Sequence, residues 1–474
     1  MLAGIIIRLY FHIGHIFSDD AYYSFLGHAL LVNSFPGNYL GYPVFPLRIN
    51  EIFLYALSFK IFGINEFATE VFPFIFSILN ILLTYILAKA LTKDEITSLL
   101  ASFLISFFPT DIVFATIGFP DLINVFFINL GILCLVKAYE TKKILLSIIS
   151  GICFFASMQF KENTYYFLIM LSIIWIYLLV NKKPHHYLVA IPIILICSNI
   201  LLEGIFYLIK EGQFFYRLEI TESNYRYSYY DFFPHTAFQA IGNGKSIWLA
   251  LIYQVFIINL RSIFLRRFYL FLPLIALIWS YIALRKKKYN LLCFWFLGLV
   301  ILFAGFTTSF SQYKPLDLHR SWYIYPMLMP VIIFSAMFIA GLKNYLKYIV
   351  VGLYIFFSIV MCKGYEVYFG KENGNKFKNF IKGNRDKVIY TDPFTKYSID
   401  LLRNYKDETD SKRILGKDFD LLQIPNGAWI VFNQKHLDEL KLQKHNFPKF
   451  TLLNSKHFKL LGSFEDFKIY EKVF

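Results

Sequence analysis

The sequence predicts a polytopic α-helical membrane protein followed by a small α/β domain. Of its 474 residues, 57% are hydrophobic and 17% are charged, and the mean hydropathy is +0.51. Apolar runs of roughly 18–20 residues recur through the first three quarters of the chain, and each can cross a hydrocarbon core of roughly 30 Å. The strict alternation of a membrane β-barrel is absent, so helices are expected to satisfy the backbone in lipid.

Basic residues in the short loops set the predicted orientation. The net charge is +15, and many of the positive charges lie in "AKALTK", "YETKK", "NKKPHH", "LRKKK" and "GLKNYLK", between the apolar runs. This is the positive-inside pattern, so we expect these loops in the cytoplasm and the protein in the cell (inner or plasma) membrane. The charge therefore does not point to nucleic acid. No cleavable signal pattern is seen, so the first apolar segment is expected to remain as a span.

We expect about eleven transmembrane helices and an external C-terminus. The first covers residues 1–17, and the external loop 18–66 is predicted to hold amphipathic helices on the outer membrane surface. The next six spans are expected at 68–90, 97–117, 122–138, 144–160, 163–180 and 187–209, before a Tyr-rich external loop at 210–245. Either both apolar halves of 246–284 cross the membrane or only 268–284 do, and we favour the second count. One further span is expected before "SFSQYKPLDLHRSWY" and one after it, and the last span is expected at 347–362.

The two predicted domains are a membrane domain over 1–364 and a soluble external domain over 365–474. The second is charged and polar and has no apolar run of span length. In it, "KVIYTD" and "AWIVFN" predict strands, "KYSIDLLRNY" and "KHLDELKL" predict helices, and "FKLLGSFEDFKIYEKV" predicts a closing hairpin. About 100 residues is an ordinary domain size.

Ionisable side chains gather at the predicted external face. Asp19 and Asp20 follow the first span in "FSDDAYY", and Asp121 lies in the turn between the third and fourth spans. Lys161 and Glu162 lie in the turn between the fifth and sixth. Charged groups at such depth are candidates for function. The alternatives are helix caps, with Ser18 or Asp19 capping a surface helix, and a solvated turn at Lys161 and Glu162.

Six segments follow one another along the chain: "DDAYY", "GYPVFPL", "SFKIFGINEFATEVF", "FFPTDIVFATIGFPDLINVFFINLGILCLVKA", "GICFFASMQFKENT" and "HRSWYIYPMLMPVIIFSA". Together they resemble the GT-C glycosyltransferases that use polyprenyl-phosphate sugars, in the branch with the protein O-mannosyltransferases and the lipid A aminoarabinose transferases. No segment is specific alone, but their order and predicted topology match. The resemblance implies the GT-C fold for the membrane domain.

The resemblance also implies roles for particular residues. The first acid of the family's acidic pair is its proposed catalytic carboxylate, which is Asp19 here, with Asp20 in the second position. Asp121 matches an acid at the external end of the hairpin between the third and fourth spans. Lys161 and Arg320 match basic residues at the end of the fifth span and before the late Pro-containing span.

One departure limits how closely the family can be followed. The aminoarabinose transferases carry Glu-Lys-Pro in the first loop, where this chain has Gly41-Tyr42-Pro43. The acid and the base are thus missing, which argues against the same substrate and against a metal held by that acid. Arg48 or Lys60 could replace the base in binding phosphate.

We therefore expect an enzyme that moves a sugar from a polyprenyl-phosphate donor to a hydroxyl of a lipid, glycan or protein at the extracytoplasmic face. A carboxylate can act as general base, and fixed cations can stabilise the phosphate leaving group. The expected catalytic residues are Asp19, Asp20 and Asp121. Donor phosphate is expected to contact Lys161, Arg320, Arg48, Arg266 and Arg267. The expected substrate contacts are Glu162, Tyr22, Tyr23 and His319.

No cofactor is required for this chemistry, although a divalent metal is possible. His12, His15 and Asp19 have the spacing i, i+3, i+7, which places them on one helical face if the first helix extends that far. Two other functions stay open: an envelope polysaccharide polymerase or ligase, and a multi-span transporter or flippase. A transporter is expected to show inverted repeats and ionisable residues near the membrane centre, neither of which is seen here.

Overall fold

The computed structural model describes residues 1–33, 44–230, 252–305, 318, 321–405, 411–413, 420–434, 437, 453, 456–464 and 466–473. Contacts divide the chain into two compact units. The helical unit comprises Met1–His12, Pro73–Thr116 and Pro120–Lys363, and the mixed unit comprises Ile13–Phe72, Ile117–Phe119 and Gly364–Phe474. The division by contacts falls between Lys363 and Gly364, and the predicted domain boundary at 364/365 stays a prediction. The first predicted external loop, however, groups with the C-terminal region, because their side chains share a core.

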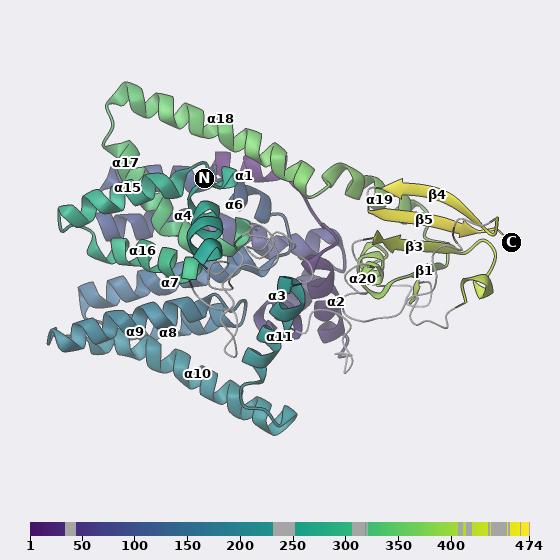
Figure 1. Cartoon of the computed structure of the whole chain (residues 1–474), viewed down its shortest axis with the longest axis horizontal. Helices are drawn as coiled ribbons and strands as arrows, with labels where there is room; N and C mark the ends of the chain where they lie inside the picture. The colour runs from purple at the N-terminus through teal and green to yellow at the C-terminus, as the bar shows by residue number, and fades with distance from the viewer. Residues whose placement is uncertain are drawn as a thin grey trace. The chain divides into compact units, whose positions relative to one another are not determined.

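The helical unit is built from α-helices and short 3-10 or π segments (Figure 1). In order, these are α1 Leu2–Tyr10, α4 Glu66–Thr92, α5 Glu95–Ser106, α6 Pro109–Phe114, α7 Pro120–Thr141, α8 Ile144–Met158, α9 Thr164–Val180, α10 Tyr187–Glu211, α11 Tyr216–Tyr230, η2 Gln254–Asn259, α14 Leu260–Phe264, η3 Arg267–Tyr269, α15 Leu272–Arg285, α16 Asn290–Gly305, η4 Ser321–Met327, α17 Leu328–Ala340 and α18 Asn344–Tyr368. Helix α4 begins in the mixed unit, and α18 ends there.

Five helical stretches of the described residues are long and apolar enough to cross a membrane. They are Glu66–Thr92, Pro120–Thr141, Tyr187–Glu211, Tyr323–Ala340 and Asn344–Tyr368. Six shorter apolar helices accompany them, α15 and the continuous stretch Gln254–Phe264 among them. The helical membrane architecture is therefore confirmed, while the number of crossings stays a prediction.

Two predicted spans are wrong in extent. The first, expected over 1–17, is helical only from Leu2 to Tyr10, roughly 14 Å. Gly14, with a φ of 81°, lies in the non-helical segment that follows. The second, expected over 97–117, is divided into α5 and α6. Pro109 starts α6, and Phe108 before it is extended, as a residue preceding proline prefers.

A buried polar network joins α1, α4, α6 and η4 inside the helical unit. The Arg8 guanidinium contacts the Asp111 carboxylate at 2.5 Å, and both side chains are fully buried. Arg8 also donates to the Ser77 hydroxyl at 2.6 Å, and the Tyr325 hydroxyl donates to Asp111. Asn80 adds a longer bond to the same carboxylate, 3.4 Å. Each charge is compensated, as burial in lipid-facing protein requires.

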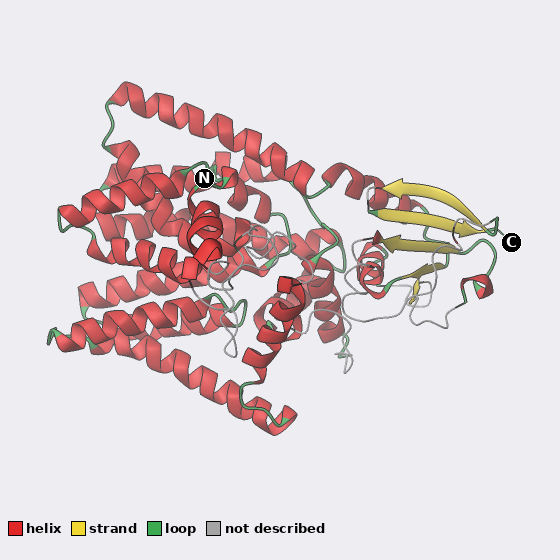
Figure 2. Cartoon of the chain, in the orientation of Figure 1, coloured by secondary structure: helices red, strands yellow, loops and turns green. Residues whose placement is uncertain are grey.

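The mixed unit combines helices with a five-stranded sheet. Its helices are α2 Asp19–Leu31, α3 Ile49–Phe62, α19 Lys371–Gly383 and α20 Pro393–Leu402, with short 3-10 segments η1 Phe45–Leu47 and η5 Leu421–Gln423. The strands are β1 Ile389–Thr391, β2 Ser411–Arg413, β3 Trp429–Asn433, β4 Phe458–Phe464 and β5 Phe467–Lys472. All strands of the described chain lie in the C-terminal region (Figure 2). The predicted strands, hairpin and first helix coincide with β1, β3, β4–β5 and α20.

The sheet has the order β2-β1-β3-β5-β4. Strand β1 pairs in parallel with β2 and β3, and β5 pairs antiparallel with β3 and β4. Alternate residues of the central strands face opposite sides because the side-chain period of a strand is two. Ile389, Trp429 and Ile469 join a core with α19 and α20. Tyr390, Ile430 and Tyr470 join a second core on the other face.

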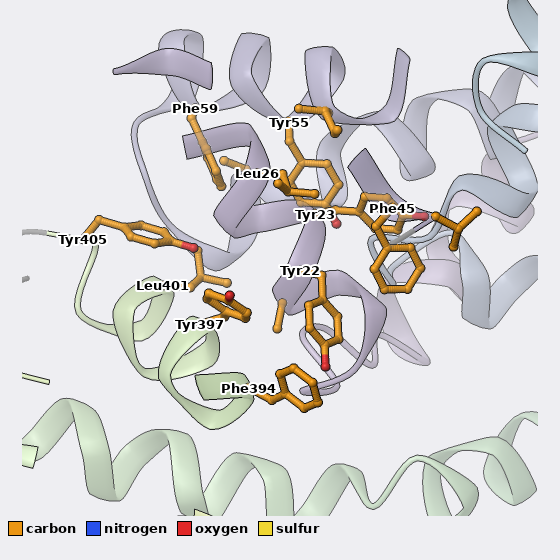
Figure 3. Packing of buried hydrophobic residues seen from close by; sticks show 14 residues of the cluster. Tyr22, Tyr23, Leu26, Phe45, Tyr55, Phe59, Phe394, Tyr397, Leu401 and Tyr405 are labelled. Atoms are coloured by element: carbon orange, nitrogen blue, oxygen red, sulfur yellow. The ribbon is translucent and has the colours of Figure 1, made fainter. Parts of the chain in front are cut away.

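A third core unites the first predicted loop with the C-terminal region (Figure 3). Tyr22 of α2 packs against Phe394 and Tyr397 of α20, with ring centroids 5.1 and 5.7 Å apart. Tyr397 also stacks on Phe25 at 4.3 Å. Helices α2 and α3 approach closely, since a Cβ on Gly27 would lie 2.4 Å from the Tyr55 Cβ. Helix α20 is therefore part of the support of α2.

Tyr397→Ala is expected to lower the free energy of unfolding of the mixed unit by about 3–5 kcal/mol, because it removes a large aromatic side chain from a packed core. Tyr397 is only 1% exposed. The measurement is thermal unfolding together with limited proteolysis of the purified protein. Leu460→Ala is the control: its side chain is 52% exposed, and an effect within about 0.5 kcal/mol is expected. Equal effects of the two substitutions would contradict this account of the core.

Candidate functional site

The start of α2 is organised around the Asp20 carboxylate. One oxygen accepts hydrogen bonds from the backbone N–H groups of Ser18 at 2.7 Å and Ala21 at 3.0 Å. The other accepts from the N–H of Ile16 at 2.6 Å and lies 2.8 Å from His15 Nδ1. Asp20 is completely buried. Its side chain therefore fixes the turn that leads into the helix.

Burial acts to raise the pKa of Asp20, but opposing interactions prevail. The attraction of His15 and the hydrogen bonds from His15, Ile16 and Ser18 lower the pKa of Asp20 below its ordinary value of 3.8. A charged carboxylate is favoured where donors converge on it. Asp20 thus stays ionised and engaged, a poor arrangement for accepting a proton.

Asp19, the first helical residue of α2, is in a different environment. Its side chain is half-buried, and the Ser18 hydroxyl lies 3.5 Å from one of its carboxylate oxygens. Ser18 occupies the N-cap position, as one of the alternatives expected, but its side chain makes no capping hydrogen bond. The two acids of the pair therefore differ: Asp20 holds the turn, and Asp19 is the more accessible.

Arg48 lies beside Tyr23 in the mixed unit. It is buried, and its guanidinium donates to the Tyr23 hydroxyl at 2.6 Å. Burial raises the pKa of Tyr23 well above its ordinary range, the Arg48 charge opposes this rise, and the Asp19 and Glu51 carboxylates add to it. The side chains of four residues therefore interact in one small region: Tyr23, Arg48, Asp19 and Glu51. Tyr22 and Tyr23, expected to contact substrate, are 3% and 0% exposed, so their packing gives them a structural role.

Two buried acids near this region were missed by the sequence reasoning. Glu51 and Glu70 are 1% and 7% exposed. Burial, followed by the charges of Glu51, Asp20, Tyr23 and Glu70, raises the pKa of Tyr55 well above its ordinary range. The Tyr55 hydroxyl donates to the Gly118 carbonyl at 2.8 Å. The only sign of either residue in the sequence was an acidic side chain within a mostly apolar helix.

Asp121 and Lys161, predicted separately, form an ion pair in the helical unit. The Lys161 ammonium lies 2.6 Å from the Asp121 carboxylate, and both side chains are buried. The same ammonium lies 5.6 Å from the centre of the Tyr323 ring. The side-chain amide of Asn124 in α7 donates a hydrogen bond to the Lys161 backbone carbonyl at 3.3 Å. The predicted catalytic set is thus divided, with Asp19 and Asp20 in the mixed unit and this pair in the helical unit.

Glu162 belongs to a second charged group of the helical unit. Arg217 of α11 contacts Glu203 at 2.6 Å and Glu162 at 3.9 Å. It also donates to the Met158 carbonyl at 3.0 Å. Arg217, which is 4% exposed, was missed because it sits in a Tyr-rich segment that reads as a loop. It fastens α11 to the turn that carries Lys161.

The remaining candidates are more exposed or lie outside the described chain. Arg266 donates to the Leu318 carbonyl at 2.8 Å, while Arg267 is exposed against the Phe268 ring. Lys60 is exposed at the end of α3. The predictions for His319, Arg320, Gly41-Tyr42-Pro43 and residues 231–245 of the Tyr-rich loop fall outside the described residues.

The suggested metal face at the first helix is wrong. Helix α1 ends at Tyr10, so His12, His15 and Asp19 do not share a helical face. His15 points Nδ1 at Asp20 and has Nε2 3.3 Å from the Ser398 hydroxyl. Among the residues that the structure describes, no group of three His, Cys, Asp or Glu side chains is arranged to hold a metal ion.

The chain can now be compared with known proteins. Residues 51–202 match the family described as dolichyl-phosphate-mannose-protein mannosyltransferase. ArnT from Cupriavidus metallidurans in the apo state has a similar structure, with a TM-score of 0.59 at 10% identity over 99% of this chain and 95% of that one. ArnT bound to undecaprenyl phosphate gives 0.59 at 10% identity over 98% and 96%. No curated protein sequence matches significantly.

A third similar structure is the archaeal oligosaccharyltransferase AglB from Archaeoglobus fulgidus, in complex with an inhibitory peptide and a dolichol-phosphate. Its TM-score is 0.54 at 11% identity, over 92% of this chain and 69% of that one. The resemblance to the GT-C glycosyltransferases is confirmed. The structural likeness shows the fold, and the match of residues 51–202 to a mannosyltransferase family agrees with the predicted enzyme class, a glycosyltransferase.

Lys161→Met is expected to raise the KM for a polyprenyl-phosphate donor about tenfold or more, if Lys161 binds the donor phosphate through a charged hydrogen bond. Lys161→Arg keeps the charge and is expected to stay within a few-fold of the wild type. Initial rates at several donor concentrations give KM and kcat separately. An unchanged KM in Lys161→Met would assign Lys161 to pairing with Asp121 alone.

Acidification is expected to destabilise the mixed unit through Asp20. Its folded pKa is lowered from 3.8, so its stabilising contribution is fully present above pH 3.8 and is lost as the pH falls through the folded pKa. Thermal unfolding in detergent, followed from neutral pH to below 3.8, measures this loss. In Asp20→Asn, the part of the stability loss at low pH that is due to this carboxyl is expected to disappear. An identical pH dependence in the variant would contradict the assignment.

Proposed function

We propose that the protein is an integral-membrane glycosyltransferase that moves a sugar from a polyprenyl phosphate to an acceptor hydroxyl at the extracytoplasmic face of the cell membrane. The family match and the GT-C fold support the donor class. The observation that carries the assignment of the base is the contrast within the acid pair. Asp20 is buried and held by three backbone N–H groups and His15, whereas Asp19 is half-buried at the start of α2.

In this proposal Asp19 accepts the proton of the acceptor hydroxyl. The acceptor oxygen then bonds to the anomeric carbon of the donor sugar, and the bond from that carbon to the lipid phosphate oxygen breaks. Charge develops on the sugar ring as in other oxocarbenium-like glycosyl transfers. Asp20 fixes the turn that presents Asp19, and Asp121 assists by holding Lys161.

The leaving group is a lipid phosphate, and its growing negative charge needs fixed cations. Lys161 and Arg48 are the described candidates with buried, oriented side chains. Arg266, Arg267 and Arg320 are further candidates in the same role. Arginine is well shaped for this task because its planar guanidinium can make paired hydrogen bonds to phosphate.

The C-terminal region is proposed to shape the acceptor site. Its support is the packing inside the mixed unit, where α20 contacts the helix that begins with Asp19. A substitution in α20 can therefore reach the carboxylate through α2 without touching the substrate. The acceptor is a hydroxyl of a lipid, a glycan or a protein.

A transfer assay tests the proposal. The purified protein is supplied with radiolabelled polyprenyl-phosphate sugars differing in sugar, and with acceptor lipid, glycan and peptide fractions. Transfer of label from at least one lipid phosphate to an acceptor, with release of the polyprenyl phosphate, is expected. Movement of the intact donor across a vesicle membrane without bond cleavage would instead identify a flippase and overturn the proposal.

A further inference from the structure

The helical unit contains an apolar cavity at the opposite end of α7 from Asp121. It lies among α7, α8, α9, α10 and α16 and has a volume of about 570 Å³, within the roughly 300–1,000 Å³ typical of ligand pockets. Its walls are almost entirely hydrocarbon, with Leu135, Met170 and Ile174 as examples. Glu140 lines it near the end of α7, whereas Asp121 begins that helix. At about 1.5 Å per residue, the two lie roughly 28 Å apart.

Basic loops adjoin helices that line the cavity. Glu140 itself is neutralised, because Lys93 and Lys137 pair with its carboxylate. The loop after α9 carries the exposed Lys182 and Lys183, and the loop before α16 carries exposed lysines at 286–288. Both helices line the cavity. An apolar slot with a positively charged rim matches a molecule with a hydrocarbon chain and an anionic head.

One wall residue offers a second observation. Trp295 of α16 lines the cavity and is 3% exposed. Its indole N–H has no hydrogen-bond acceptor among the residues that the structure describes. Buried N–H donors are normally paired, since an unmade bond costs free energy. An ester or phosphate oxygen of a bound molecule could accept this bond.

The surrounding surface indicates access from the bilayer. Ile173 and Tyr177 of α9 and Leu291 of α16 line the cavity and are 49%, 60% and 42% exposed. Such apolar exposure is costly in water, so we expect these faces of α9 and α16 to lie against lipid. The lysine-rich loops are those expected in the cytoplasm, where the leaflet carries anionic lipids that attract basic segments.

We propose that this cavity is a binding site for an anionic phospholipid of the lysine-rich leaflet. One acyl chain fills the slot between α7, α9 and α16, and the phosphate head interacts with the lysines after α9 and before α16. The site is independent of the proposed transfer chemistry, because its lining includes none of the residues assigned there.

Contact quenching of Trp295 tests this proposal. The full-length protein in detergent is titrated with phosphatidylglycerol carrying a dibrominated acyl chain, and separately with phosphatidylcholine carrying the same chain. The signal of Trp295 is the difference between the wild type and Trp295→Phe. We expect phosphatidylglycerol to quench the fluorescence of Trp295 saturably. The concentrations needed should be about tenfold or more below those needed for phosphatidylcholine. Equal quenching by the two lipids would overturn the anionic preference.

Charge and volume variants locate the site. Lys183→Glu with Lys288→Glu is expected to raise the half-saturating phosphatidylglycerol concentration roughly tenfold or more, because each lysine near an anionic surface contributes several-fold. Lys343→Glu with Lys347→Glu makes the same change of charge in the α17–α18 region, which does not line the cavity, and is expected to leave it unchanged. Leu135→Phe with Ile174→Phe narrows the slot and should abolish saturation. Equal effects of both charge pairs, or full binding by the narrowed variant, would overturn the proposal.

Discussion

Asp19→Asn is expected to reduce sugar transfer by about 10²–10⁴-fold, the usual contribution of a general base, while leaving the folded protein intact. The amide has nearly the size of the carboxylate but cannot take the acceptor proton. Because the amide keeps the shape of the half-buried side chain at the start of α2, little packing is lost. The measurement is the rate of labelled transfer, alongside the melting temperature of the same preparation.

Asp20→Asn is the matched control, since it makes the same change one residue later. Asp20 accepts three backbone hydrogen bonds and contacts His15, so its loss of charge should lower stability by about 1–3 kcal/mol. The two variants should therefore differ: Asp19→Asn should lose activity, and Asp20→Asn should lose stability. Full activity in Asp19→Asn would sink the assignment of the base. Loss of activity at unchanged stability in Asp20→Asn alone would transfer the role to Asp20.

Arg8→Met is expected to destabilise the helical unit by about 3–5 kcal/mol, the usual cost of breaking a buried ion pair. The substitution leaves the fully buried Asp111 carboxylate without its cation. It also removes the donors to Ser77, to the Gly4 carbonyl at 2.8 Å and to the Ser106 carbonyl at 3.0 Å. The loss is measured as a lower melting temperature and a lower yield of monodisperse protein in detergent.

The double variant Arg8→Met with Asp111→Leu tests the cause. Replacing both charges leaves no isolated buried ion, so much of the lost stability should return. If the double variant is as unstable as the sum of the two single variants, the network matters through packing or through Ser77 and Tyr325, and not through the uncompensated charge. Lys347→Met, a change to a half-buried lysine of α18, controls for loss of a positive charge and should have little effect.

Periodicity and charge made much of the helical unit predictable. Five of the six spans expected between 68 and 209 match single helices within a few residues, α4 and α7 to α10, because their apolar runs are long and bounded by lysine-rich turns. The sixth is divided at Pro109. The effect of a proline on the preceding residue is local, and in the sequence the continuous apolar run around Pro109 was the stronger signal. The first was too long because hydropathy does not reveal where a backbone leaves the helix, as it does after Tyr10.

The candidate site was predictable in its residue types but not in its partners. "DDAYY" marked Asp19 and Asp20 without distinguishing them, since adjacent acids look alike until backbone donors converge on one of them. Asp121 and Lys161 were each marked, yet their pairing depends on how α7 packs against the end of α8. Arg8 and Asp111 were missed, although a single charge within an apolar run is itself a signal of a buried partner.

The sequence alone determined the membrane class, the order of the helices, the strands of the C-terminal region and the resemblance to a family of lipid-linked glycosyltransferases. These depend on composition, on periods of two and 3.6, and on ordered motifs, all of which are local along the chain. Only the tertiary structure decided which acid is held and which is accessible, that α20 supports α2, and that a basic-rimmed apolar cavity lies between α7, α9 and α16. Those features come from contacts between residues up to hundreds of positions apart, and no local pattern specifies them.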